Sequence, residues 1–71
     1  MSLSLQELRK VASRNTVHNG AEGFSIERRD VEPETFNRLV REAVESSGQD
    51  FVAFPQTDGH RGYSALYVLP F

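Results

Sequence analysis

The chain has 71 residues, of which 38% are hydrophobic and 25% charged, and its formal net charge at pH 7 is −2. This length predicts one small domain over residues 1–71, and the composition is ordinary for a soluble globular protein. The absence of cysteine excludes disulfides and thiolate metal sites. The acidic balance argues against a general DNA-coating protein, which would normally be basic.

The same properties set expectations about location and partners. Cysteine-free composition fits a cytoplasmic protein. No signal-peptide pattern is expected in `MSLSLQELRK`, and no stretch approaches the roughly 20 apolar residues of a membrane span. A core of this size gives only about 3–5 kcal/mol of net stability, so we expect support from another chain, either in a homodimer or with a different protein.

The first predicted element is a helix from Leu5 to Arg14. Ser4 precedes Glu7 by three residues, which is the spacing of a capping box at a helix start. One acid against three bases leaves the first 16 residues with a charge of +2. The bases lie in the second half of the helix, where they complement its dipole: Arg9, Lys10 and Arg14.

A hairpin is predicted next, around Asn19-Gly20. Both central residues of a type I′ turn need positive φ, and this pair adopts it readily. The strand before the turn is predicted to be short, near 16–18. After Gly23 the residues alternate between apolar and polar, as in a strand with one buried face: Phe24, Ser25, Ile26 and Glu27.

The second helix is predicted from Pro33 to Ser47. Proline suits the first helical position, and Gly48 supplies the terminator. Glu34 and Arg38 are spaced to form an ion pair on the outer face. The core-facing stripe follows helical spacing: Phe36, Leu39, Val40, Ala43 and Val44.

The last predicted element is a second hairpin. One strand is `DFVAF`, which we expect to end at Pro55, and the other runs from about Tyr63 to Leu69. The order helix, short strand or hairpin, helix, hairpin predicts an α+β fold. We expect a small two-layer domain with an antiparallel sheet of three to four strands and two packed helices.

The second hairpin is apolar on both faces. Period-2 alternation gives two sets in the last strand, one with Tyr63, Tyr67 and Phe71 and one with Leu66 and Val68. The second set is expected to pack against the helices. Three interpretations remain for the aromatic set: a helix covers each face of the sheet, the aromatic face forms a homodimer contact, or it binds a different protein.

The loop between these strands is the only cluster that mixes an acid, a base and a cation. An enzyme could use His60 as general base and Arg61 to hold an anion, but adjacent residues on a glycine loop are poorly preorganised. His18 and His60 lie in separate turns, so no metal site is predicted. The sequence predicts neither an enzyme nor a cofactor.

In its size, composition and lack of a catalytic signature, the chain resembles the small accessory proteins of phages and mobile elements. That resemblance implies an inhibitor or modulator that acts by direct contact with a larger protein complex. We therefore expect a non-enzymatic protein-binding module. The alternative is a small nucleic-acid-binding module that uses the basic first helix and the aromatic strand. The predicted binding residues are Tyr63, Tyr67 and Phe71 as anchors, with His60 and Arg61 at the rim.

Overall fold

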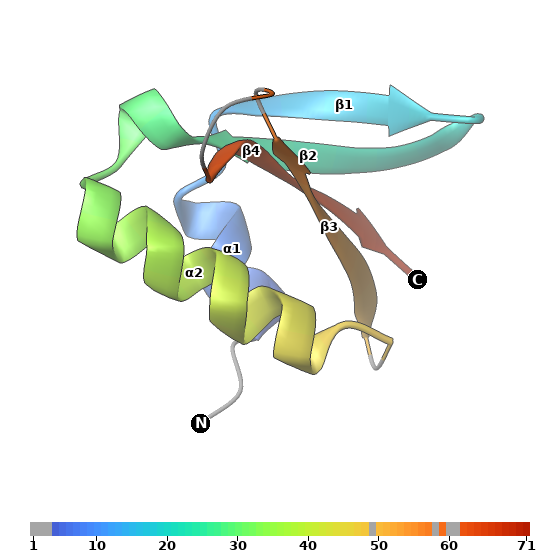
Figure 1. Ribbon diagram of the computed structural model, residues 1–71. Helices are drawn as coiled ribbons and strands as arrows, with labels where there is room; N and C mark the ends of the chain where they lie inside the picture. Colours follow the sequence, from blue (N-terminus) through green and yellow to red (C-terminus); the bar gives the residue numbers. More distant parts are fainter. Residues whose placement is uncertain (1–3, 49, 58, 60–61) are drawn as a thin grey trace.

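The computed structural model describes residues 4–48, 50–57, 59 and 62–71. Its strands form one antiparallel sheet in the order β1-β2-β4-β3 (Figure 1), so the predicted α+β fold is confirmed. The elements are α1 (Leu5–Lys10), β1 (Arg14–His18), β2 (Ala21–Glu27), a 3-10 turn (Arg28–Asp30), α2 (Pro33–Ser46), β3 (Phe51–Thr57) and β4 (Tyr63–Pro70).

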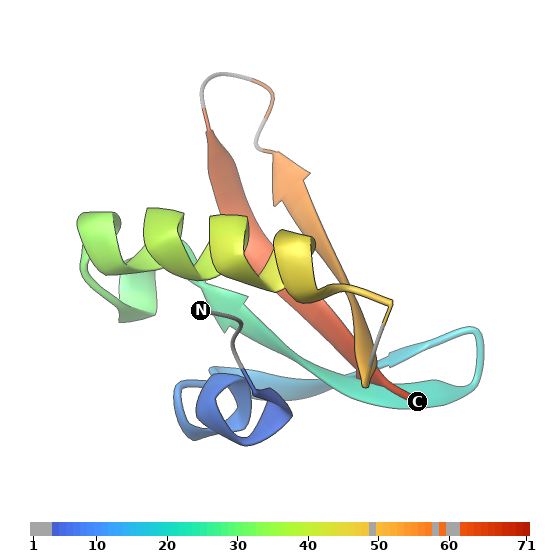
Figure 2. The ribbon, with the colours of Figure 1, turned by 90° about the horizontal axis from the view of Figure 1, so that it is seen from below.

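Both helices pack on the same face of the sheet, and Figure 2 shows them together in front of it. Leu8 of α1 belongs to the same buried cluster as the residues of α2 and of the strands. Leu66 and Val68 are completely buried there, as the alternation predicts. The interpretation that places one helix on each face is therefore wrong. The remaining strand residues of this core are Phe24, Ile26, Phe51 and Ala53.

The first helix is shorter than predicted. Ser4 and Glu7 form the expected capping box: the Glu7 amide donates to Ser4 Oγ at 3.2 Å, and the Ser4 amide donates to Glu7 Oε1 at 3.3 Å. The helix ends at Lys10 because the chain must turn into β1, which already begins at Arg14. Tertiary pairing with β2 thus overrides the helical tendency of the last predicted turn.

The second helix follows the prediction with two corrections. Phe36, Leu39, Val40 and Ala43 of the predicted stripe are buried, but Val44 is 46% exposed. Arg38 pairs with Glu42 at 3.6 Å, where the prediction had paired it with Glu34. Gly48 follows the C-cap residue with φ +102°, a conformation that L side chains rarely adopt, so it terminates the helix as predicted.

The first hairpin is longer and more regular than the sequence indicates. Asn19 and Gly20 have φ values of 52° and 84°, as a type I′ turn requires. The pairs run from His18 opposite Ala21 to Arg14 opposite Ser25. Phe24 and Ile26 of β2 then pair with β4, opposite Val68 and Leu66. β2 is therefore the strand that joins both hairpins into one sheet.

In the second hairpin, Pro55 does not end its strand. β3 continues through it to Thr57, because β3 is an edge strand and a proline nitrogen can face away from the ladder there. The pairing shifts by one residue between Gln56 and Thr57. Gln56 lies opposite Ala65, whereas Thr57 lies opposite Tyr63, and this bulge changes which face Tyr63 meets.

Within the part of the chain that the structure describes, no helix is both long enough and apolar enough to cross a membrane.

Candidate functional site

The sheet face that points away from the helices is strongly apolar. We call it the open face and define it by four half-buried side chains, Val52 and Phe54 of β3 and Tyr67 and Leu69 of β4. The pairs Val52–Leu69 and Phe54–Tyr67 lie directly across the two strands. The Phe54 and Tyr67 rings stack, with centroids 5.7 Å apart and planes 21° apart. An aromatic platform therefore lies on a face that neither helix covers.

The end of the first hairpin curls over this platform. The His18 ring centroid lies 5.0 Å from that of Tyr67 and 5.3 Å from that of Phe54, in edge-to-face geometry. In a flat sheet β1 would be about 10 Å from β4 and about 14 Å from β3. The sheet must therefore be strongly coiled, and the open face is concave.

Gly23 permits this curvature at the point where β2 leaves β4. A Cβ atom at residue 23 would lie 2.7 Å from Leu69 Cδ2 and closer still to the backbone carbonyl oxygen of Val68. No real Cβ atom tolerates such a contact without a shift of its neighbours. Glycine is thus required by the close approach of two backbones, and Leu69 covers the space where a side chain would be.

Three buried polar atoms on this concave face have no hydrogen-bond partner among the described residues. They are Thr16 Oγ1, His18 Nε2 and Ser25 Oγ. A buried polar group without a partner costs about 1–3 kcal/mol, so finished protein cores contain few of them. The open face thus combines apolar rings with three unsatisfied polar atoms, whereas the helix side has one among the described residues, Ser46 Oγ.

The structure separates the residues that the sequence predicts for binding. Tyr67 lies in the centre of the open face, and Phe71 lies beyond the end of β4 with 76% of its surface exposed. Tyr63 does not share this face, because the bulge turns it toward α2, where it lines a pocket of about 410 Å³ with Val40 and Val44. The predicted rim residues, His60 and Arg61, lie outside the described residues.

The two features that favoured nucleic-acid binding lie on opposite sides of the sheet. Arg9 of the basic helix α1 sits over the buried Phe24 ring, 4.9 Å from its centroid, on the helix side. Tyr67 is on the open face. At the sheet edge, the Glu27 carboxylate pairs with Arg14 at 3.5 Å and with Arg29 at 3.3 Å. These features do not combine into one basic aromatic surface.

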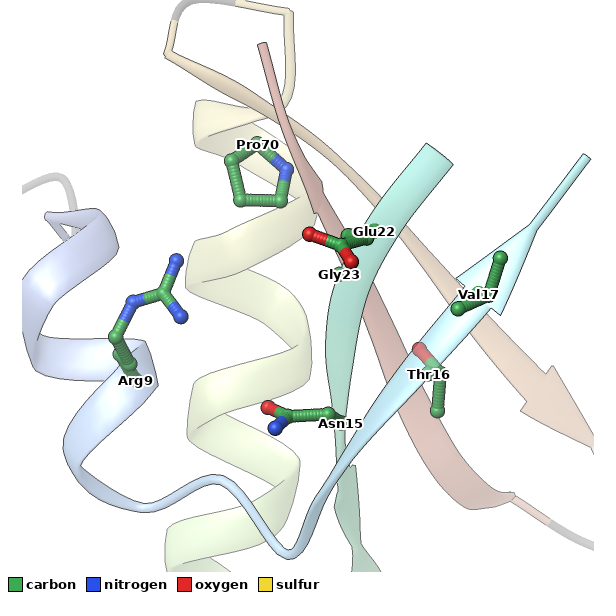
Figure 3. Close-up of a pocket in the computed structure, with 7 residues that line it drawn as sticks. All are labelled: Arg9, Asn15, Thr16, Val17, Glu22, Gly23 and Pro70. Atoms are coloured by element: carbon green, nitrogen blue, oxygen red, sulfur yellow. The ribbon is translucent and has the colours of Figure 1, made fainter. Parts of the chain in front are cut away.

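A second hollow lies between α1 and the first hairpin. It has a volume of about 410 Å³, and Figure 3 shows Arg9 extending from the helix toward the strands that line it. Asn15 and Val17 of β1 and Glu22 of β2 contribute to its wall. Its charges are of opposite sign, Arg9 at the helix and Glu22 on the hairpin, and it borders the outer edge of β1.

The described residues contain no metal-binding cluster. Within residues 4–48, 50–57, 59 and 62–71 there is no group of three or more His, Asp or Glu side chains placed to hold a metal ion. His18 is engaged with the aromatic rings of the open face. The loop predicted as the weak enzyme candidate carries Asp58, His60 and Arg61, which lie outside the described residues.

Two members of the aromatic cluster, Phe54 and His18, are not among the residues that the sequence predicts for binding. Phe54 could have been found, because it alternates with Ala53 in a strand that is apolar on both faces. His18 could not, since it is two strands away from Tyr67 in the sheet order. Only the coiling of the sheet brings the two rings together.

Comparison of the chain with protein-family models, with curated proteins and with solved structures finds no match in any of the three.

Proposed function

We propose that this chain is a non-enzymatic protein-binding module that uses its open face as the contact surface. It acts as a small inhibitor or modulator by direct contact with a larger protein complex, in the manner of phage or mobile-element accessory proteins. The observation that carries the proposal is the stacked Phe54–Tyr67 platform on a sheet face that neither helix covers. A contiguous apolar face of this kind is typical of an interface.

The chemistry of the face fits a protein partner. Tyrosine and phenylalanine are enriched at protein interfaces, because they bury a large area with little loss of conformational entropy. Tyr67 is the central anchor in this proposal, and the exposed Phe71 extends the contact beyond the end of β4.

The test is affinity capture from extract of the native cell with three immobilised variants. Tyr67→Ala and Phe71→Ala each remove one anchor, whereas Val44→Ala removes an exposed apolar side chain from the helix side as a matched control. Circular dichroism establishes that each variant is folded. We expect a partner that wild type and Val44→Ala retain and that both anchor variants lose at least tenfold.

Two outcomes would overturn the proposal. One is a folded Tyr67→Ala protein that binds every captured partner as strongly as wild type does. The other is binding to single- or double-stranded oligonucleotides that falls steeply as salt rises, since this dependence identifies contacts to phosphate. The second outcome would assign the chain to the nucleic-acid-binding class.

A further inference from the structure

The two edge strands of the sheet, β3 and β1, differ in how far their outer backbone groups are protected from pairing with another chain. The outer edge of β3 is closed: the Ala53 amide donates to Ser47 Oγ at 2.9 Å, and the Phe51 carbonyl accepts from the Gly48 amide at 2.7 Å. Pro55 has no N–H to offer at the next outward position. These are familiar devices that prevent an edge strand from pairing with another chain.

The outer edge of β1 has no such protection. His18 and Ala21 flank the two-residue turn as a hydrogen-bonded pair, so Thr16 and Arg14 also direct their backbone groups toward β2. Asn15 and Val17 therefore direct theirs outward. Among the described residues neither has a hydrogen bond beyond the strand ladder, and the Val17 side chain is 66% exposed.

We infer that β1 pairs edge to edge with β1 of a second copy of this chain. The antiparallel register places Thr16 on the two-fold axis, with Asn15 of each copy opposite Val17 of the other. Both residues have outward-directed backbone groups, so the two pairs make about four main-chain hydrogen bonds. The pairing closes on itself, because each copy contributes the same edge, and it leaves no further unprotected β1 edge.

The charges along this register favour a second copy. Arg14 of one copy lies opposite His18 of the other, so no two like charges face each other across the new pair. On the helix side of the sheet, Asn15 lies directly across from Phe24, and Arg9 lies over the Phe24 ring. Val17 lies directly across from Glu22. The register joins Phe24 and Asn15 of one copy to Val17 and Glu22 of the other, so Arg9 and Glu22, which have opposite charges, lie at the two ends of the joined row.

The association has consequences for both surfaces already described. The sheet doubles in width, and the two open faces lie side by side. The hollow beside β1 in Figure 3 becomes continuous with its symmetry mate, since Asn15 and Val17 line it in each copy. The edge of β1 contains none of the anchor residues, so its pairing is independent of the proposed protein-binding function.

The first test is the mass of the intact chain in solution, by sedimentation equilibrium from micromolar to millimolar concentration. We expect a dimer. Val17→Pro removes an outward N–H at a position where an edge strand tolerates proline, and it is expected to weaken the dimer at least tenfold. Val17→Thr, which keeps the N–H and the β-branched shape, is the matched control and is expected to dimerise like wild type.

The second test fixes the register and does not depend on a proline. The chain has no cysteine, so Asn15→Cys and Val17→Cys proteins can be prepared separately and oxidised alone or as a mixture. Residues directly opposite in such a ladder have Cα atoms about 5.5 Å apart, within disulfide range. We expect a crosslinked dimer in the mixture and little in either variant alone.

A chain that stays monomeric up to millimolar concentration would overturn the inference. A folded Val17→Pro protein that dimerises as strongly as wild type would also overturn it. The same holds if the mixture of the two cysteine variants is dimeric but gives no more crosslinking than each variant alone. If Val17→Pro fails to fold, the crosslinking comparison alone decides.

Discussion

Gly23→Ala is the most direct probe of how the fold makes its open face. The added methyl group would lie 2.7 Å from Leu69 Cδ2 and even closer to the carbonyl oxygen of Val68. The leucine can rotate aside, but the carbonyl belongs to the ladder in which Phe24 pairs with Val68. The substitution therefore has to push β2 away from β4 at the point where the hairpin bends.

The magnitude follows from two opposing effects. A forced shift of packed backbone costs about 1–3 kcal/mol, and the upper part of that range applies where a backbone group must move. Loss of glycine's freedom in the unfolded chain returns about 0.4–1 kcal/mol. The net loss is about 2 kcal/mol, which for a domain of this size lowers the melting temperature by about 10 °C.

Urea denaturation followed by circular dichroism measures this loss. Gly20→Ala is the control, since its Cβ would meet no atom within 4 Å and only the positive φ is strained, at about 1–2 kcal/mol. Proton NMR of the His18 ring gives an independent readout, because displacement of the hairpin removes it from the shielding of Tyr67 and Phe54. A Gly23→Ala protein as stable as wild type would refute the close approach.

Three further predictions test the helix side and the aromatic cluster. Ser4→Ala removes the capping box of α1 and is expected to cost about 1 kcal/mol in thermal denaturation, whereas Glu7→Gln keeps most of the cap. His18→Ala removes two edge-to-face contacts and is expected to cost about 1–2 kcal/mol of stability. A double-mutant cycle with Phe54→Leu should show coupling between the two residues, and additive losses of stability would contradict the contact. Leu8→Ala empties a fully buried site and is expected to cost about 2–5 kcal/mol, enough to unfold much of the population; unchanged hydrogen exchange in β2 and β4 would argue against that packing.

Local sequence patterns predicted much of this fold correctly. The capping box at Ser4, the turn at Asn19-Gly20 and the terminator at Gly48 depend on the conformations available to a few adjacent residues. Because those preferences are local, the residues at each turn or helix end specify it without help from the rest of the chain. Alternation likewise predicted that Leu66 and Val68 would be buried, since a strand presents successive side chains to opposite faces.

Other features of the fold depend on strand pairing, so the residues next to them in the sequence do not predict them. The bulge between Tyr63 and Ala65 moves the Tyr63 side chain from the expected face to the side of α2, and a bulge is a property of two paired strands. The early end of α1 and the continuation of β3 through Pro55 are likewise decided by which strand pairs with which. The sequence alone offered no measure of these competing pairings.

The candidate site shows the same division. Alternation along the strands already predicts that the last hairpin is apolar on both faces, with Tyr67 on the face away from Leu66 and Val68. The position of both helices on one face, and the coiling that brings His18 onto Tyr67 and Phe54 on the other, depend on contacts between distant parts of the chain. The coiling depends on the close approach of β2 and β4 at Gly23, where the two backbones come together. Gly23 and Val68 are far apart in the sequence, so no local pattern encodes their contact.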